Sequence, residues 1–337
     1  MIALGVFAAI VGTAIVLLMD WFPTEADTAA PRIDTLYDVL LVFSVPIFVL
    51  VMSVVIYSVI RFRARPGDMG DGAPIHGNTR LEVFWVTVPF LIVTGLSVYG
   101  WIVLNDVEAK KPNTMIVNVT AQQFTWHFDY PSQRVKSDQL ILPKDRPVEF
   151  RLKTKDVIHS FWVPEFRLKS DIVPGMTTKI RLTPNRVGSW NVVCAELCGL
   201  GHSTMRQEVK VMPAADFQAW VQKNGSGQRA AGGGQGGGAA AGKQAFASNG
   251  CAGCHTFKPA NASGTIGPDL DQLKAVAAKR EKGKSAAAYV KQSIEDPRAF
   301  TVKGFPKNVM PTTFKKDIPP QQLDALVQYL LGGGKSK

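Results

Sequence analysis

Apolar residues gather near the start of the chain in three long runs. The second run covers residues 39–60 and the third covers residues 83–104, and neither contains a charged residue. Each is long enough to cross the hydrocarbon core of a bilayer, which takes about 20 residues. A buried helix of a soluble domain is the alternative, although such helices seldom go so long without a charge. We therefore expect a transmembrane hairpin over residues 31–107, with helices at about 37–62 and 82–104.

The first apolar run, residues 1–19, has two interpretations. It could belong to a signal peptide, with a passable cleavage site at Thr28-Ala29-Ala30, but it lacks the basic residues that usually begin such a peptide. It could instead remain as an extra transmembrane helix. Both interpretations of residues 1–30 stay open.

The loop between the two later runs sets the orientation of the hairpin. It contains Arg61, Arg63, Arg65 and Arg80, and loops rich in arginine and lysine lie on the cytoplasmic side. Everything after Leu104 is then extracytoplasmic. This gives a multi-pass membrane protein whose remaining domains face away from the cytoplasm.

Beyond the hairpin, residues 114–212 alternate between apolar and polar positions in the manner of β-strands. The clearest examples are residues 115–119, 148–152, 178–182 and 190–193. Short strands separated by proline and glycine turns predict an all-β sandwich or barrel. We assign this domain to residues 108–224.

Residues 225–242 read GSGQRAAGGGQGGGAAAG, a composition that predicts a flexible linker. From residue 243 to 337 the spacing of apolar residues becomes helical, most clearly over residues 286–295 and 320–331. A small α domain on a flexible tether is therefore expected. The tether would keep it near the β domain at high effective concentration.

The net charge is +11, from 38 lysines and arginines against 27 acidic residues. Much of the excess lies after residue 255. A basic surface outside the cytoplasm does not meet chromosomal DNA, so we expect no nucleic-acid partner. Acidic redox proteins and anionic lipid head groups fit this charge better, and an ordinary solvated surface fits it equally well.

The later cysteine pair lies in a haem attachment signature. Cys251 and Cys254 are followed directly by His255, and in the C-x-x-C-H pattern two thiols bond the porphyrin while the histidine binds the iron. The other face of the iron needs a ligand, and Met310 is the only methionine after His255. A disulfide or half of a zinc site is the alternative.

The earlier cysteine pair lies in a loop rich in soft ligands, directly after a predicted strand. The loop supplies Cys194, Cys198, His202 and Met205. Thiolate, thioether and imidazole ligands together select copper, and the second thiolate allows two copper ions to be bridged. A further histidine would come from His127 or His159, of which His159 is the better candidate. A disulfide with two surface histidines is the alternative.

These residues resemble subunit II of the caa-type cytochrome c oxidases, in which a C-terminal class I cytochrome c domain is fused to the subunit. The resemblance implies a multidomain membrane protein with a transmembrane helical hairpin, an all-β cupredoxin-like Greek-key barrel and a small all-α cytochrome c domain. It also implies a dinuclear copper centre, CuA, and one covalently bound haem c. The CuA ligands would be His159, Cys194, Cys198, His202, Met205 and the backbone carbonyl of Glu196. The haem iron would be bound by His255 and Met310, and the Glu196 carboxylate would lie near a magnesium site facing the catalytic subunit.

The resemblance singles out three further residues. Glu82 matches an acid at the cytoplasmic mouth of a proton channel, although an ordinary acid at a helix N-terminus fits equally well. Phe124 and Trp126 match an aromatic region whose usual pattern is tryptophan-tyrosine-tryptophan. Phe124 replaces the tryptophan through which soluble cytochrome c delivers electrons, which puts that route in doubt. Trp126 could serve in core packing instead.

The expected function is that of the electron-input subunit of a bacterial haem–copper oxidase, in the cell membrane. Its expected partners are the catalytic subunit I, other oxidase subunits, membrane lipid, and a cytochrome c or a quinol–cytochrome c reductase-type complex as donor. Oxygen chemistry belongs to another subunit, because neither membrane run contains a histidine. The alternative is a membrane-anchored electron carrier without an oxidase partner.

Overall fold

The computed structural model describes residues 2–63, 66–67, 70, 74, 76–225 and 238–332. The chain divides into two compact units, Met1–Ala109 and Lys110–Lys337. Arg65 of the arginine-rich loop and residues 226–237 of the expected linker lie outside the described residues.

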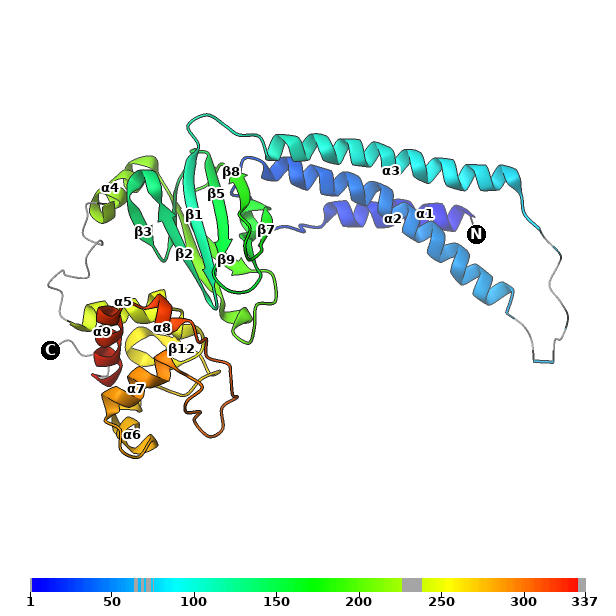
Figure 1. Cartoon of the computed structure of the whole chain (residues 1–337). Coiled ribbons are helices and arrows are strands. Elements are labelled where there is room, and N and C mark those ends of the chain that lie inside the picture. Colours follow the sequence, from blue (N-terminus) through cyan, green and yellow to red (C-terminus); the bar gives the residue numbers. More distant parts are fainter. Residues whose placement is uncertain are drawn as a thin grey trace. The chain divides into compact units, whose positions relative to one another are not determined.

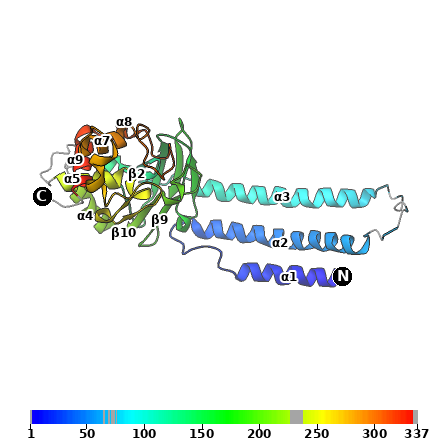
Figure 2. The ribbon, with the colours of Figure 1, turned by 90° about the horizontal axis from the view of Figure 1, so that it is seen from below.

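The first unit consists of three helices, α1 (Ile2–Leu18), α2 (Ala30–Arg61) and α3 (Thr79–Val107) (Figure 2). Both α2 and α3 are long and apolar enough to cross a membrane, and their apolar stretches are not buried within the protein. This exposure contradicts the alternative of soluble core helices and leaves lipid as the natural surrounding. The apolar helix α1 packs against α2, where a Cβ added at Gly12 would lie 3.4 Å from Val45.

Both membrane helices begin before the residues expected from the apolar runs, α2 at Ala30 and α3 at Thr79, and α3 also ends later, at Val107. Near the start of α2, Arg32 forms an ion pair with Asp106 near the end of α3. Polar residues continue a helix past the hydrocarbon region when water or a partner satisfies them, so the apolar runs underestimate the helix lengths. Pro46 and Pro89 lie inside α2 and α3 without ending them, as membrane helices permit.

Residues 110–225 of the second unit fold as two five-stranded sheets (Figure 1). The strands are β1 (Met115–Gln122), β2 (Thr125–Tyr130), β3 (Val135–Ser137), β4 (Leu140–Pro143), β5 (Val148–Thr154), β6 (His159–Trp162), β7 (Lys169–Ile172), β8 (Thr178–Leu182), β9 (Gly188–Cys194) and β10 (Arg206–Met212). One sheet has the order β3-β2-β1-β5-β8 and the other β4-β10-β9-β6-β7. The four segments predicted as strands are confirmed, in β1, β5, β8 and β9.

Side chains that alternate along the strands fill the core of this domain. Val117 and Val119 of β1 and Phe150 of β5 are fully buried. Trp126 is also fully buried and meets Phe161 of the other sheet edge-on, with ring centroids 5.7 Å apart. Such contacts join the two sheets and hold their strand ends in place. The helix α4 (Ala214–Gly225) follows the last strand.

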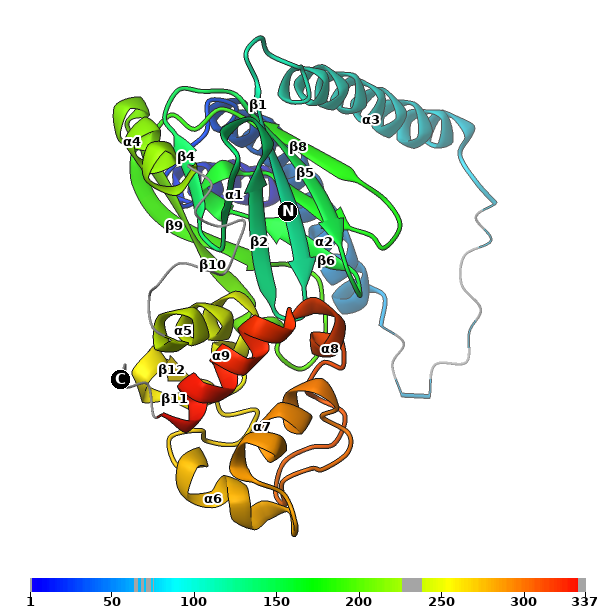
Figure 3. The same cartoon turned by 60° about the vertical axis from the view of Figure 1, so that its left-hand side comes forward.

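The C-terminal domain is helical, with a two-stranded ladder of β11 (Thr256–Phe257) and β12 (Ala262–Ser263) (Figure 3). Its helices are α5 (Gly238–Ser248), α6 (Leu273–Arg280), α7 (Ala286–Glu295), α8 (Phe314–Asp317) and α9 (Pro320–Leu331). The predicted helices at 286–295 and 320–331 are confirmed as α7 and α9. Phe246, Phe257, Leu326 and Tyr329 contribute to the buried core.

The end of the expected linker differs from the prediction, because residues 238–242 belong to α5. Three consecutive alanines favour helix there. Gly242 lies where α5 packs against α9, and a Cβ added to it would lie 2.3 Å from both the Ala325 carbonyl oxygen and Tyr329 Cβ. This glycine therefore permits close helix packing rather than chain flexibility.

Candidate copper and haem sites

The segment that carries most of the predicted copper ligands, residues 195–205, is called the copper loop here. It connects two antiparallel strands of one sheet, β9 and β10. Cys194 ends β9 and Arg206 begins β10, and the backbone N–H of Cys194 donates to the carbonyl of Met205 at 3.1 Å. This bond closes the loop at its base. The short 3-10 turn His202–Thr204 then orients the last part of the loop.

The loop brings the sequence-predicted sulfur and nitrogen ligands into one continuous cluster. Cys194 Sγ lies 3.8 Å from His159 Nδ1 and 3.8 Å from Cys198 Sγ. Cys198 Sγ in turn lies 3.6 Å from His202 Nδ1 and 3.8 Å from Met205 Sδ. The Glu196 carbonyl oxygen lies 3.2 Å from Cys194 Sγ. Two sulfur atoms thus lie between two imidazoles, a set of thiolate, thioether and imidazole groups that would suit copper.

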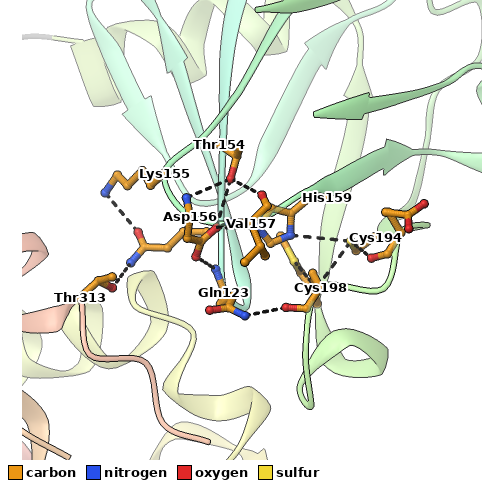
Figure 4. Close-up of polar contacts among 12 residues, drawn as sticks. Gln123, Thr154, Lys155, Asp156, Val157, His159, Cys194, Cys198 and Thr313 are labelled. Atoms are coloured by element: carbon orange, nitrogen blue, oxygen red, sulfur yellow. Dashed lines mark hydrogen bonds and ion pairs between the residues drawn. The ribbon is translucent and has the colours of Figure 1, made fainter. Parts of the chain in front are cut away.

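His159 reaches the cluster because β6 pairs with β9, with Phe161 opposite Cys194. In Figure 4, His159 lies between Asp156 and Cys194. Its Nε2 lies 2.8 Å from Asp156 Oδ1. A carboxylate can only accept, so Nε2 carries the proton and Nδ1 is left free to bind a metal. Asp156 was not recognised in the sequence, although an acidic residue three positions before a ligand histidine is a usable signal.

Asp156 also organises the neighbouring turn. It accepts hydrogen bonds from the backbone N–H groups of Gln123 and Val157, at 2.7 and 2.8 Å. Burial alone would raise the pKa of Asp156, but the hydrogen bonds from His159 and the two backbone groups outweigh burial and lower it. The carboxylate is therefore charged where it faces the imidazole.

The two cysteine pairs differ in how their surroundings affect the pKa values of the thiols. A hydrogen bond with Cys198 and the adjacent imidazole of His159 outweigh burial and lower the pKa of Cys194, whereas the same contact with Cys194 and burial raise the pKa of Cys198. Burial raises the pKa of Cys251 to about 12 and also raises that of Cys254. None of the four cysteines is in a disulfide. The thiolate form is therefore favoured at Cys194 of the first pair, whereas both thiols of the second pair are kept neutral among apolar groups.

The ring of Phe124 packs on the copper loop. A Cβ added at Gly201 would lie 2.5 Å from Phe124 Cδ2, and one added at Gly199 would lie 3.2 Å from Phe124 Cζ. The neighbouring Gln123 donates from Nε2 to the Cys198 carbonyl at 2.6 Å. The two residues support the loop from the adjacent sheet, a role the sequence did not reveal.

Other residues singled out in the sequence lie away from the cluster. The Nδ1 atom of His127 is 3.1 Å from Asp138, on a part of β2 that does not reach the cysteines. The Trp126 ring meets the His159 ring edge-on, with the ring centroids 6.3 Å apart. The Glu82 carboxylate accepts from the backbone N–H of Asn78 at the start of α3, as a helix-capping acid does.

The haem attachment residues line a single pocket in the helical domain. Cys251, Cys254, His255 and Met310 all border it, together with apolar side chains such as Leu270 and Phe300. His255 Nδ1 donates to the Pro268 carbonyl at 2.8 Å, which leaves Nε2 available to bind iron. Gly267 permits this approach, because a Cβ there would lie 2.5 Å from the imidazole. The apolar lining, the neutral thiols and the oriented histidine fit a covalently bound haem c.

Comparison with known proteins agrees with this architecture. Family models match in succession for the transmembrane domain of cytochrome c oxidase subunit II (residues 14–103), the periplasmic domain of that subunit (residues 132–212) and cytochrome c (residues 239–333).

Individual relatives are cytochrome c oxidase subunits 2. The chain is 32% identical to that of Thermostichus vulcanus over 63% of this chain and 83% of the relative. The chain is 31% identical to cytochrome c oxidase subunit 2 of Bacillus subtilis, over 82% of this chain and 81% of the relative. Identity to that of Alkalihalophilus pseudofirmus is 29%, over 91% and 90%. The chain belongs to the cytochrome c oxidase subunit II family, in the form fused to a C-terminal cytochrome c domain, and serves electron input to a haem–copper oxidase.

Proposed function

We propose that electrons pass from an external donor through a haem c and a dinuclear CuA centre of this chain to the catalytic subunit I, which reduces oxygen. One observation carries the proposal above the others: two unpaired cysteine sulfurs lie between two imidazole Nδ1 atoms in a cluster whose neighbours are 3.6–3.8 Å apart. A copper pair bound there would supply one-electron redox chemistry.

The proposed copper ligands are the side chains of His159, Cys194, Cys198, His202 and Met205 and the carbonyl oxygen of Glu196. The protein holds them at the ends of the paired strands β6 and β9 and in the loop between β9 and β10, and it excludes water from several of them. His159 and Met205 are fully buried, and Cys198 is 3% exposed. Rigid, buried ligands limit the rearrangement that accompanies a change of charge, which favours rapid electron transfer.

The proposed haem c is bonded by Cys251 and Cys254, with His255 and Met310 as iron ligands. Histidine with methionine is the pair that raises the reduction potential in cytochromes c. Pro268 orients His255 through its carbonyl. The external donor would be a cytochrome c or a quinol–cytochrome c reductase-type complex.

The tip of the copper loop is proposed to meet the catalytic subunit. Leu197 and Leu200 are 78% and 64% exposed, and the Glu196 side chain between the two cysteines is exposed as well. Exposed leucines beside a metal-ligand loop suit a protein partner. The Glu196 carboxylate would then hold magnesium at that interface.

The proposed location is a bacterial cell membrane, with α2 and α3 in the lipid beside other oxidase subunits and both cofactor domains outside the cytoplasm. The arginines around the connecting loop support this orientation. A proton-channel role for Glu82 stays a prediction beside its capping contact, and so do the two interpretations of residues 1–30.

Metal analysis and spectroscopy of the purified full-length chain test the proposal. We expect two coppers and one covalent haem per chain, with an electron paramagnetic resonance signal from one unpaired electron shared by two coppers. Co-purification with a multi-helix haem protein is expected from native membranes. A chain that carries haem but no copper after full copper loading would contradict the proposal.

A further inference from the structure

The outer face of one sheet of the β domain carries a group of cations. Alternate side chains of a strand point to the same face of its sheet, and in β5 the exposed residues Arg151 and Lys153 share the outer face. In the neighbouring strand β8, the exposed Lys179 lies directly opposite Arg151. Positive charges therefore lie side by side on two adjacent strands.

These cations have few partners within the protein. Arg151 donates from Nε to Glu149 at 3.0 Å, and its two terminal nitrogens make no hydrogen bond within the described part of the chain. Lys153 and Lys179 form neither a hydrogen bond nor an ion pair with any residue that the structure describes. Like charges directly opposite each other destabilise a sheet. A surface that serves solubility alone needs no such cluster, because charges of both signs can be interspersed.

The three cations line a groove. Its volume is about 950 Å³, within the range of about 300–1,000 Å³ that is typical of small-ligand sites. Arg151, Lys153 and Lys179 all border it, and so does Thr120 of β1, which lies opposite Lys153 in the sheet. The groove therefore combines positive charge with a hydroxyl group in a concave surface.

The groove also contains three acids, Asp129, Asp138 and Asp317. Each of them already meets a nitrogen atom of another side chain, at 3.2, 3.1 and 3.6 Å from Asn118, His127 and Lys155 respectively. Within the sheet, Asn118 pairs with Asp129 on one side and with Arg151 on the other, and so separates them. The acids therefore leave the charge of the three cations largely uncompensated.

We propose that this groove binds a ligand that carries phosphate groups, held by Arg151, Lys153 and Lys179. The terminal nitrogens of an arginine match two oxygens of one phosphate. Lysine ammonium groups add point charges that can turn toward further oxygens. The Thr120 hydroxyl offers one more hydrogen bond. None of the proposed copper or haem ligands lines the groove, so this site does not depend on the proposed electron path.

Two sources could supply the phosphate. One is a soluble phosphate compound outside the cytoplasm, and the other is the head group of an anionic lipid. Both present the same chemistry to the three cations, because a phosphate oxygen accepts from arginine and lysine in either case.

Calorimetric titration of the full-length, cofactor-loaded chain with inorganic pyrophosphate tests the site. We expect saturable binding of one pyrophosphate per chain. Lys153→Gln and Lys179→Gln should each weaken it at least about tenfold, because each removes a charged donor. Lys210→Gln, at an exposed position of the other sheet, is the matched control and should leave the affinity unchanged. Absence of saturable binding, or equal weakening by all three substitutions, overturns the proposal.

Thermal unfolding adds a readout that a purely structural lysine would not give. Without ligand, Lys179→Gln should raise the unfolding midpoint of the β domain, because it removes the repulsion opposite Arg151. Pyrophosphate should raise the midpoint of the unsubstituted chain, since a ligand stabilises the state that binds it, and should have little effect on Lys179→Gln. Equal stabilisation of both proteins by pyrophosphate overturns the proposal. Heat from capture of copper by pyrophosphate would persist in both lysine variants, so it cannot imitate the expected loss of binding.

The same titration in lipid vesicles distinguishes the two sources. The full-length chain is reconstituted in phosphatidylcholine with or without anionic phosphatidylglycerol. A lower affinity for pyrophosphate when phosphatidylglycerol is present supports the proposal with a lipid head group as the ligand. An unchanged affinity supports it with a soluble phosphate compound as the ligand. Loss of pyrophosphate binding in both kinds of vesicle overturns the proposal.

Discussion

Asp156 accepts a hydrogen bond from Nε2 of His159 at 2.8 Å, on the side of the imidazole opposite Cys194. The contact fixes both the ring orientation and the position of the proton. Removing the carboxylate in Asp156→Ala should weaken copper binding by about 10- to 100-fold, since partners of this kind orient a metal-binding histidine. Competition with a copper chelator, followed by the copper-centre spectrum, measures the change.

Asp138→Ala provides the matched control for that substitution. It removes the carboxylate that lies 3.1 Å from His127, another histidine of the same domain. His127 is outside the copper cluster, so copper affinity should stay unchanged. Equal weakening in both variants would mean that Asp156 acts through general stability of the domain.

Substitutions in the two cysteine pairs should affect the copper and haem contents independently. Cys198→Ser removes one of the two sulfurs proposed to bind copper, so the copper pair should be lost while the covalent haem and its spectrum remain. Cys254→Ser should remove one thioether bond and disturb haem attachment while the copper pair stays intact. Metal analysis and haem absorbance of the two purified variants report both outcomes. Loss of both cofactors in either variant would contradict separate sites.

Local motifs made much of the copper and haem sites predictable. Cys194, Cys198, His202 and Met205 lie within one loop, so their spacing alone brings them together. The ligand role of His159 had to be weighed against His127, because its approach to Cys194 depends on pairing between strands 35 residues apart. The structure brings His159, and not His127, to the cysteines.

Supporting residues were harder to predict, because their roles depend on tertiary packing. Gln123 reaches the Cys198 carbonyl across 75 residues, and Gln122 reaches Asp317 across 195. No periodicity or motif identifies such a contact. Gly242 was assigned to a linker because glycine is typical of flexible segments, whereas the structure uses it for close packing of helices.

Gly242→Ala should destabilise the haem domain. The added methyl group meets the Ala325 carbonyl and Tyr329 Cβ, both at 2.3 Å, and neither is a flexible side-chain tip. Overpacking of this kind costs about 1–3 kcal/mol. The haem absorbance of the full-length protein on heating should report a lower midpoint for that domain.

Gly238→Ala is the control in the same helix. Its methyl group would meet only the side-chain oxygen of Gln328, at 2.9 Å, and that side chain can move aside. Stability should therefore be retained or slightly raised, since alanine favours helix over glycine. A similar loss in both variants would point to helix α5 itself rather than to its packing against α9.

The buried carboxylate of Glu149 links two strands of the β domain. It accepts from Arg151 Nε at 3.0 Å and from Arg181 Nε at 2.9 Å, and its side chain is 6% exposed. Burial alone would raise the pKa of Glu149, but hydrogen bonds and attraction from the two arginines outweigh burial and lower it. The charged form is therefore more stable in the folded protein than in the unfolded chain.

Because the pKa of Glu149 is lowered in the folded protein, its charged form adds to stability at pH values above the pKa of glutamate in the unfolded chain, about 4.3. This contribution is lost as the pH falls from there toward the pKa of Glu149 in the folded protein. Glu149→Gln should lower the free energy of unfolding at pH 7 by about 1–3 kcal/mol, because two arginines lose a charged acceptor. The difference between the two proteins should shrink below about pH 4. Urea unfolding followed by tryptophan fluorescence at both pH values measures it. Asp145→Asn, at an exposed acid, is the control and should change little; a difference for Glu149→Gln that grows toward low pH would contradict the assignment.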